Sequence, residues 1–468
     1  MSLVRDPATG ETITEVAESG AAEVAAGFER ARAGLAQWRA LSASRRGAIL
    51  VEVARRLHAD ADAFARIEAR NVGKTLADTR REAGRAAEAF AYYGGWADKA
   101  TGTTIPVDGP FHTYTRREPY GVVVGIVPWN VPYVFAAKKF APALAMGNAC
   151  LLKPAEETPL TALRLAEVLA AAGVPDGVAQ VLPGGRATGQ ALVGDPRADL
   201  VVFTGSDQAG RAVAATAAGQ LTPVALELGG KSPQLVFADA DLDAALEAVL
   251  LGVFGATGQM CIAGSRLLLA ESIHDPFLDR LAQRVRGLKV GDPLAPDTQV
   301  GPQVTAAQRD KTLRYLAAGR AEGAREVARA ELPDDPRLAG GFFAPPTVFA
   351  DVTGDMSVAR DEIFGPVLAV QRFRDEQQAL ALAHQTEFGL AAGVWSRDLA
   401  RALRVAHALE VGTVWLNSYR VLSDLVPFGG VRHSGYGREH GEEAVRLYSR
   451  VKSVWTALAP GLPPGYRL

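Results

Sequence analysis

The sequence predicts an α/β protein with two parallel-sheet domains and a small β extension. Short apolar runs rich in β-branched residues begin at Gly121, and each suits a strand buried on both faces. Helical patterns separate these runs, and such alternation is typical of a doubly wound parallel sheet. The alternation resumes near Gly230 and continues to about Val431, which predicts the second domain. The length of 468 residues is enough for about three folding units of roughly 150 residues each.

The first hundred residues are predicted to be helical, and the strands of the first sheet follow them. Residues 21–38 and 42–71 carry apolar side chains at helical spacing. Residues 158–172 form the clearest later helix, with Thr158 as N-cap, Pro159 at the first helical position and Gly173 as terminator. The predicted strands are residues 121–127, 149–153, 178–182 and 200–204.

Two further segments, residues 111–117 and 447–455, are predicted strands outside this alternation. Ligands of open parallel sheets bind at the carboxyl ends of the strands, so the functional site is expected there. The expected organisation is a first domain from residues 1–100 and 120–229, a second from 230–433, and an extension from 101–119 and 449–461.

Composition and charge exclude several classes of function. Lys and Arg number 50 and Asp and Glu 52, so the formal net charge of −2 gives no basic footprint for nucleic acid or an anionic membrane. No uncharged apolar run of about 18 residues occurs, and the opening residues lack the apolar core of a signal peptide. Two cysteines cannot form a disulfide framework and suit a reducing compartment. A cytoplasmic protein without nucleic-acid or membrane partners is expected.

The commonest catalytic motifs are absent, and one cysteine remains as the reactive candidate. The seven histidines form no HExxH motif and no Cys/His cluster, so no metal site is expected. The patterns G-x-x-x-x-G-K-[ST], G-x-S-x-G and G-x-G-x-x-G do not occur. Cys261 follows a helical pattern at residues 241–254, and Gly258 permits a tight turn that presents the thiol. Cys150 lies in an apolar strand pattern and is expected to be buried packing.

Two polar residues at predicted strand ends accompany Cys261. Glu227 ends an apolar run before a Gly-Gly turn, and a carboxylate among apolar neighbours rises in pKa, which suits a general base. An ion pair with Lys231 is the alternative for this carboxylate. Asn130 directly follows the first buried strand, where its amide can donate to an oxyanion, and an ordinary turn residue is the alternative.

Seven segments, in chain order, together resemble the aldehyde dehydrogenase superfamily. The resemblance covers the chain from about Asp6 to Trp455 and implies a Rossmann-like NAD-binding domain, a catalytic domain at 230–433, oligomerisation strands and a homodimer or homotetramer. The matching segments are Pro128-Trp129-Asn130, Lys153-Pro154-Ala155-Glu156, Phe203-Thr204-Gly205-Ser206, Glu227-Leu228-Gly229-Gly230-Lys231, Gly258-Gln259-Met260-Cys261, Glu362-Ile363-Phe364-Gly365-Pro366 and Pro427-Phe428-Gly429-Gly430.

The resemblance implies oxidation of an aldehyde to a carboxylic acid with NAD, or with NADP as the alternative cofactor. The Cys261 thiolate attacks the aldehyde carbon, while the Asn130 amide and the Cys261 backbone N–H hold the oxygen. Glu227 activates the water that hydrolyses the thioester. The cofactor-binding residues implied are Val127, Pro128, Trp129, Lys153, Glu156, Gly185, Phe203, Thr204, Gly205, Ser206, Leu228, Gly229, Glu362 and Phe364.

The resemblance also places Phe135, Lys138, Met260, Ile262 and Arg420 at the small-molecule aldehyde. Phe135 and Lys138 share one helix face, because residues three apart on a helix are neighbours. Lys138 and Arg420 at the mouth of one tunnel predict an aldehyde with an anionic tail, and side chains that point into solvent are the alternative.

Three residues depart from the family pattern: Ala256 stands where many members have Asn, His384 where Asn is frequent, and Arg432 where Lys is usual. Ala256 bears on the ordering of the turn before Cys261. Two other functions remain as alternatives. A CoA-acylating semialdehyde dehydrogenase is disfavoured because that branch lacks the base found here as Glu227, and a catalytically silent structural relative because both thiol and base are present.

Overall fold

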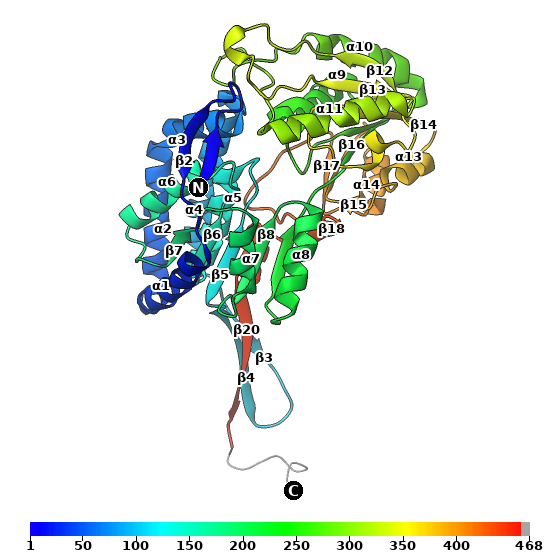
Figure 1. The fold of residues 1–468 in the computed structure, drawn as a ribbon. Helices are drawn as coiled ribbons and strands as arrows, with labels where there is room; N and C mark the ends of the chain where they lie inside the picture. Colours follow the sequence, from blue (N-terminus) through cyan, green and yellow to red (C-terminus); the bar gives the residue numbers. More distant parts are fainter. Residues whose placement is uncertain (460–468) are drawn as a thin grey trace.

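The computed structural model describes residues 1–459, which form two α/β bodies and a long β extension that projects from the first of them (Figure 1). Each body contains its own sheet, and the sheets are largely parallel. The α/β fold class predicted from the sequence is therefore confirmed.

The first body is built on a six-stranded sheet with the order β19-β9-β8-β5-β6-β7. The short β19 (Gly435–Tyr436) joins its edge antiparallel to β9. The chain runs outward from β5 to β7 and returns on the other side of β5, so the topological switch point lies between β5 and β8. The parallel strands are β5 (Val122–Ile126), β6 (Ala149–Lys153), β7 (Ala179–Val181), β8 (Leu200–Thr204) and β9 (Val224–Glu227).

Helices cover both faces of this sheet. One apolar core joins the strands to α2–α6 through residues such as Phe64, Phe90 and Phe140, and another joins them to α1, α7 and α8 around Phe28. A hairpin of β1 (Ser2–Arg5) and β2 (Thr12–Val16) precedes them. The helices are α1 (Ala21–Ala40), α2 (Ala43–Ala59), α3 (Ala61–Val72), α4 (Leu76–Trp96), α5 (Pro132–Ala145), α6 (Leu160–Ala171), α7 (Arg186–Gly194), α8 (Asp207–Ala218) and α15 (Gly441–Leu447).

The second body has a seven-stranded sheet with the order β12-β13-β14-β11-β10-β16-β17, in which β12 pairs antiparallel. Its strands are β10 (Pro233–Val236), β11 (Arg266–Ala270), β12 (Arg325–Arg329), β13 (Thr347–Ala350), β14 (Val367–Phe373), β16 (Ala391–Trp395) and β17 (Thr413–Leu416). Its helices are α9 (Leu242–Phe254), α10 (His274–Arg286), α11 (Ala306–Ala321), α12 (Ser357–Arg360), α13 (Glu376–Ala383) and α14 (Leu399–Ala408), and β15 (Phe388–Gly389) pairs with β18 (Val431–Arg432).

The extension consists of three antiparallel strands, β3 (Thr104–Ile105), β4 (Phe111–Pro119) and β20 (Ser449–Ala457). The two longer strands pair along their whole length, from Ser449 opposite Pro119 to Ala457 opposite Phe111. The two predicted strands are therefore present. Residues 460–461, which belong to the predicted extension, lie outside the described residues.

One predicted helical region is divided, and one predicted helix cap was wrong. The helical pattern at residues 42–71 forms two helices, because Asp60 has φ −104° and ψ 12° and its carboxylate pairs with Arg164 of α6. Thr158 does not cap α6: its hydroxyl donates to the Trp129 carbonyl, 3.3 Å away, and Pro159 takes the N-cap position. Gly173, with φ 101°, follows the helix as predicted.

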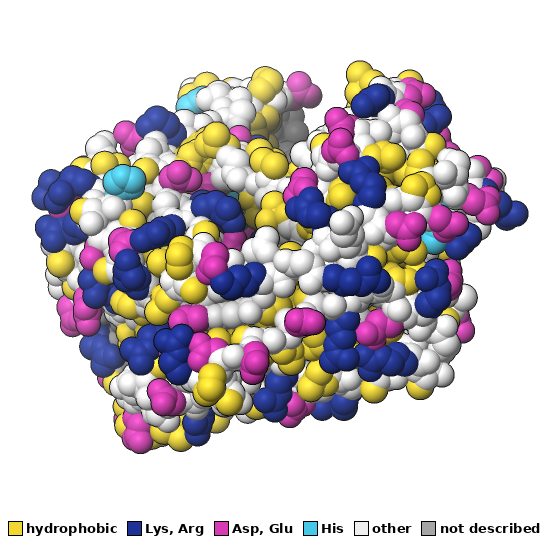
Figure 2. Space-filling model, turned by 90° about the horizontal axis from the view of Figure 1, so that it is seen from above, with side chains coloured by type: hydrophobic (Ala, Val, Ile, Leu, Met, Phe, Trp, Pro, Cys, Tyr) yellow, Lys and Arg dark blue, Asp and Glu magenta, His cyan; other side chains and the backbone are white. Residues whose placement is uncertain are grey.

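Charged side chains of both signs are interspersed over the face seen in Figure 2, without a large patch of one sign. Within residues 1–459, no helix combines the length and the apolar character needed to cross a membrane.

Candidate active site

The carboxyl ends of β5, β8 and β9 border a cavity of about 180 Å³ that also receives residues of the second body. All three predicted catalytic residues lie on it, with many of the predicted cofactor residues. The lining residues are Pro128, Trp129, Asn130, Phe135, Thr204, Gly205, Ser206, Glu227, Leu228, Gly229, Cys261, Gln308, Lys311, Glu362 and Phe364.

Cys261 lies at the end of a strained segment, residues 255–261, which we call the cysteine turn. Ala256, Thr257 and Gly258 have φ values of 53°, 59° and 71°, so three consecutive residues are left-handed. This conformation is uncommon for Ala and an outlier for a β-branched Thr, so the surroundings must maintain it. A Cβ on Gly258 would lie 2.2 Å from the Gly365 carbonyl oxygen, which confirms the tight turn predicted at this glycine.

Buried polar groups of the second body brace the cysteine turn. The Thr257 hydroxyl donates to the Gly301 carbonyl at 3.1 Å, and Gln303 Nε2 donates to the Thr257 carbonyl at 3.1 Å. The backbone N–H of Val304 donates to Gln259 Oε1 at 3.0 Å. These bonds attach the turn to the chain that leads into α11.

The two cysteines differ in their access to the cavity. Burial raises the pKa of Cys261 to about 12, and the carboxylates of Glu362 and Glu227 add to this effect. Its thiol is therefore protonated at neutral pH until a base or a positive charge approaches. Cys150 is fully buried in β6 and does not line the cavity, so the prediction that it is packing is confirmed.

Glu227 is 5% exposed, and neither of its carboxylate oxygens has a hydrogen-bond partner among the described residues. Burial raises its pKa well above the usual range, and the nearby Glu439 carboxylate raises it further. The amine of Lys231 is also buried and has no hydrogen bond to any residue of the described range 1–459, so the predicted alternative of an ion pair with Glu227 is wrong. Lys139 instead pairs with Glu439 and donates to the Thr204 hydroxyl at 2.8 Å.

Asn130 connects the first body to the cysteine turn. Its Nδ2 donates to the carbonyl of Gln259 at 2.8 Å, and the side chain is buried. An amide nitrogen carries two N–H groups, so the second remains available to a ligand in the cavity.

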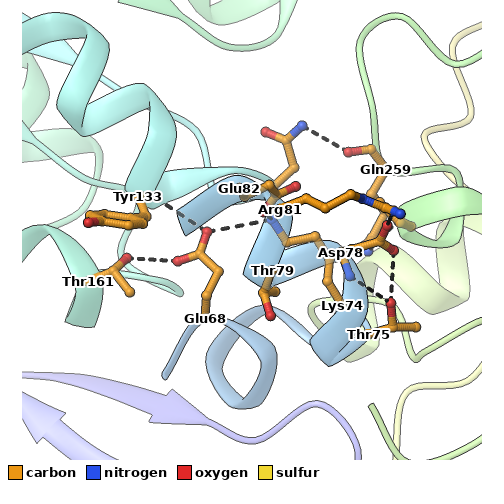
Figure 3. Close-up of polar contacts among 12 residues, drawn as sticks. Glu68, Lys74, Thr75, Asp78, Thr79, Arg81, Glu82, Tyr133, Thr161 and Gln259 are labelled. Atoms are coloured by element: carbon orange, nitrogen blue, oxygen red, sulfur yellow. Dashed lines mark hydrogen bonds and ion pairs between the residues drawn. The ribbon is translucent and has the colours of Figure 1, made fainter. Parts of the chain in front are cut away.

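A buried charge network, which the sequence analysis missed, fixes the start of α5 directly after Asn130 (Figure 3). Lys74 is 1% exposed, pairs with Glu82 and lies 3.5 Å from Glu68. Glu68 in turn accepts from the Thr161 hydroxyl at 2.9 Å and from the backbone N–H of Tyr133 at 3.4 Å. The network therefore joins α3, α4, α5 and α6.

The loop after α12 forms the opposite wall of the cavity. Glu362 Oε1 accepts from the Gly230 backbone N–H at 3.0 Å, and burial raises the pKa of this carboxyl to about 6. The Phe364 ring meets the Trp129 ring edge to face, with centroids 5.2 Å apart. Two predicted cofactor residues from different bodies are thus in contact.

Gln308 and Lys311 on α11 line the cavity and were not predicted. Gln308 Nε2 donates to the carbonyls of Ile363 at 3.1 Å and Phe364 at 2.8 Å, and Lys311 Nζ donates to the Glu362 carbonyl at 2.9 Å. These bonds fix the loop that carries Glu362. In the sequence, these two residues are marked only by their three-residue spacing on a helix. Since every helix contains such pairs, the spacing does not predict a site.

A second cavity, of about 470 Å³, lies between α7 and α8 and shares Ser206 with the first. Lys153 and Phe203 line it, and Ser206 caps α8 by accepting from the Ala209 N–H at 3.3 Å.

Other predicted cofactor residues lie near this cavity without lining it. Glu156 is exposed, and a Cβ on Gly185 would lie 2.3 Å from its Oε2. Val127 is buried and lines neither cavity.

Lys138 and Arg420 do not provide two free cations, so that prediction was wrong. Lys138 is 5% exposed, pairs with Asp424 at 2.8 Å, and places Nζ 2.7 Å from His440 Nε2. Burial lowers the pKa of Lys138 to about 8. Arg420 donates from Nη1 to the Leu251 carbonyl at the end of α9, 2.6 Å away.

Of the other predicted substrate residues, Phe135 lines the cavity, whereas Met260 and Ile262 pack beside it. Ile262 belongs to an apolar cluster with Trp415 and Tyr419, on which Cys261 also packs.

Two of the departures from the family pattern lie away from the cavity. His384 Nε2 accepts from the Glu410 backbone N–H at 3.1 Å, and Arg432 lies on the short β18 with φ 57°. The third, Ala256, lies within the cysteine turn.

Replacing Ala256 with Asn is expected to stabilise the protein by about 0.5 kcal/mol, because Asn tolerates the left-handed region better than Ala does. Thermal unfolding measures the change. Ala171→Asn, on the exposed last turn of α6, is the matched control and should be destabilising. A lower melting temperature for Ala256→Asn than for the wild type would show that side-chain space, rather than backbone strain, selects alanine.

Comparisons with known proteins identify the family of the chain. The model of the aldehyde dehydrogenase family matches residues 2–454. Betaine aldehyde dehydrogenase 1 of Rhizobium meliloti (strain 1021) is 44% identical over 457 residues, which cover 97% of this chain and 93% of that protein.

Solved structures of similar proteins superpose on nearly the whole chain. PnpE from Pseudomonas sp. WBC-3 has a TM-score of 0.97 at 40% identity, covering 99% of this chain and 96% of that one. PnpE in complex with nicotinamide adenine dinucleotide gives the same values. Betaine aldehyde dehydrogenase from Staphylococcus aureus in complex with NAD⁺ has a TM-score of 0.96 at 36% identity, covering 99% and 93%. The chain belongs to the aldehyde dehydrogenase family, and the reaction that it shares with this family is the oxidation of an aldehyde.

Proposed function

We propose that the protein oxidises an aldehyde to the carboxylic acid with NAD, through a thioester on Cys261 that is hydrolysed with Glu227 as base. The observation that carries this proposal is that the Cys261 thiol, the unpaired Glu227 carboxylate and the Asn130 amide border one cavity. The first experiment is a panel of aldehydes assayed for NADH formation. A wild-type protein that reduces no NAD with any aldehyde would refute the proposal.

The residues present fit NAD. The two cavities meet at Ser206, so together they offer an extended site between the α7–α8 slot and Cys261. The α8 N-terminus suits the pyrophosphate, the Lys153 amine and the Glu156 carboxylate suit the adenosine ribose, and Glu362 suits the nicotinamide ribose. NAD, when bound, supplies the acceptor of the hydride.

Each catalytic side chain has one task in the chemistry. The Cys261 thiol loses its proton to solvent as its sulfur bonds to the aldehyde carbon, and the Asn130 amide and the Cys261 backbone N–H stabilise the negative charge on oxygen. After the hydride leaves that carbon, a thioester remains. Glu227 takes a proton from water as the oxygen attacks the thioester carbon, and the Cys261 thiolate that leaves accepts this proton, which restores the thiol and the base. An aldehyde, water and NAD⁺ thus give an acid, NADH and a proton.

The alternative is a reaction in which CoA replaces water in resolving the thioester. Glu227 favours water, because a buried, unpaired carboxylate with a raised pKa at the cavity is a base for water activation.

NAD is expected to be preferred over NADP, because the exposed Glu156 carboxylate can accept from a ribose 2′-hydroxyl and repels a 2′-phosphate. Two unit charges about 4 Å apart at an effective dielectric near 20 repel by about 4 kcal/mol, and side-chain rotation reduces this figure. Glu156→Gln should therefore raise kcat/KM for NADP and leave that for NAD nearly unchanged. Glu167→Gln, an exposed carboxylate on α6, is the control. Equal kcat/KM for the two cofactors in the wild type would contradict this role.

We further propose that the substrate is a short aldehyde with an anionic tail. Because Lys138 is not a free cation, another positive charge must attract this tail. The Lys138 charge is compensated by Asp424, and burial with neighbouring cations lowers the pKa of His440 well below its usual value. Arg85 on α4 is close enough to lower the pKa of both Lys138 and His440, and it makes no ion pair within residues 1–459. We therefore propose that the positive charge of Arg85 attracts the anionic tail of the substrate.

Succinic semialdehyde should have a higher kcat/KM than butanal, and betaine aldehyde, whose tail is a cation, should have the lowest. Arg85→Gln is expected to reduce kcat/KM for the semialdehyde by about tenfold without affecting butanal, because a charge-assisted contact is lost. Arg80→Gln, on the same helix and paired with Asp62, is the control. A wild type that prefers butanal or betaine aldehyde would overturn the anionic tail.

We also propose that the chain forms a homodimer or homotetramer through its extension. Large apolar side chains of the extension are exposed in the single chain, among them Ile105, Val451 and Trp455. Exposed apolar groups gathered on a projecting sheet are typical of a surface that a partner covers.

A further inference from the structure

Two neighbouring residues of the loop after β17 contact the two ends of the cysteine turn. The Tyr419 hydroxyl donates to the carbonyl of Ile262, the residue after Cys261, at 3.0 Å. Arg420 Nη1 donates to the carbonyl of Leu251, in the last turn of α9 before the cysteine turn begins, at 2.6 Å. The left-handed residues of the turn lie between these two bonds.

The loop that carries this pair is itself fixed on both sides. Asn417 accepts from the Ser396 N–H and donates to the Ser396 carbonyl, each at 3.0 Å. The Trp415 indole donates to the Val421 carbonyl at 2.8 Å, and its ring packs on the Tyr419 ring with centroids 4.9 Å apart. The loop can therefore act as a fixed support.

Arg420 also faces the first body. Burial lowers the pKa of Arg420, and the carboxylates of Asp78 and Glu82, on the face of α4 shown in Figure 3, oppose this effect. Lys74 holds the Glu82 carboxylate in place. A Cβ on Gly255, the first residue of the cysteine turn, would lie 2.4 Å from Arg420 Nη1, so the guanidinium packs directly on the turn.

We propose that Tyr419 and Arg420 are positioning residues that hold the two ends of the cysteine turn and so present Cys261 to the cavity. Left-handed Ala256 and Thr257 are unfavourable alone and persist only where neighbouring structure determines them. Because the segments before and after the turn are both held, the backbone cannot move to relieve the strain at these left-handed residues. The inference rests on the proposed role of Cys261 as nucleophile.

Tyr419→Phe removes one contact and should slow the NADH burst by about tenfold while leaving NAD affinity unchanged, because a small displacement of a nucleophile lowers its rate strongly. Tyr448→Phe is the matched control, since its buried hydroxyl has no partner in the described part of the chain. Arg420→Met should act like Tyr419→Phe, and Arg420→Lys, which retains a donor for the Leu251 carbonyl, should restore part of the rate.

Alkylation by iodoacetamide, read by mass at each cysteine, provides a readout that does not depend on turnover. Release of the turn exposes Cys261 and lowers its pKa, so its labelling should rise several-fold in Tyr419→Phe while buried Cys150 stays unlabelled. Equal rises at both cysteines would indicate general destabilisation and overturn the inference, as would burst and labelling rates equal to those of Tyr448→Phe. A wild-type protein without an NADH burst would refute the proposed function. The iodoacetamide labelling of Cys261 would still show whether Tyr419 and Arg420 hold the cysteine turn.

Discussion

Replacing Cys261 with alanine is expected to reduce NADH formation by roughly 10⁴-fold or more, because no other group on the cavity can form the thioester. Stopped-flow fluorescence of NADH measures this loss. NAD affinity, measured by quenching of protein fluorescence, should be unchanged, since Glu362, Phe364 and Trp129 keep their positions around the proposed cofactor site.

Cys150→Ala is the matched control for this experiment. Its thiol is buried in β6, so its loss should destabilise the protein by about 1 kcal/mol and leave the rate per folded molecule unchanged. An active Cys261→Ala protein, or a folded but inactive Cys150→Ala protein, would show that the nucleophile has been assigned to the wrong residue.

The sequence alone could predict those parts of the site that lie at the ends of predicted strands or in short motifs. Asn130 and Glu227 directly follow or end buried strands, and parallel topology brings such ends together. Cys261 follows a helix, and Gly258 permits the turn between the helix and the thiol. These residues are placed by local pattern, which is why all three appear on one cavity.

Residues whose position depends on a distant partner could not be predicted in this way. Lys138 has the expected place on α5, but its charge is compensated by Asp424, from a loop nearly three hundred residues later. Arg420 was expected at a tunnel mouth, and a carbonyl at the end of α9 instead accepts its hydrogen bond. Such partners are set by tertiary packing, and no pattern near either residue indicates them.

The same limit applies to the strain in the cysteine turn. Gly258 predicts a turn, but nothing in the sequence of residues 255–261 predicts that Ala256 and Thr257 also adopt positive φ. That conformation depends on bonds from Gln303 and on contact with Gly365, which come from other elements. The fold class follows from pattern, whereas the presentation of the thiol follows from assembled packing.

Glu227→Gln is expected to keep a single-turnover burst of NADH and then stall. Hydride transfer precedes hydrolysis of the thioester, so loss of the base affects only the later step. Water activation by a general base typically contributes roughly 10²–10⁴-fold, and the steady-state rate should fall by that amount. Glutamine keeps the shape of the side chain and avoids the cost of burying a charge where Glu227 is 5% exposed.

The pH dependence provides a second measurement of the same role. Burial raises the pKa of Glu227, and a base acts only when deprotonated, so wild-type turnover should rise as the pH increases through that raised pKa. In Glu227→Gln, turnover should not show this rise with pH. Hydroxylamine, which attacks a thioester without a base, should restore its turnover if the acyl group accumulates on Cys261. A normal steady-state rate in Glu227→Gln would show that Glu227 is not the base for hydrolysis. A stalled enzyme that hydroxylamine does not rescue would show the same.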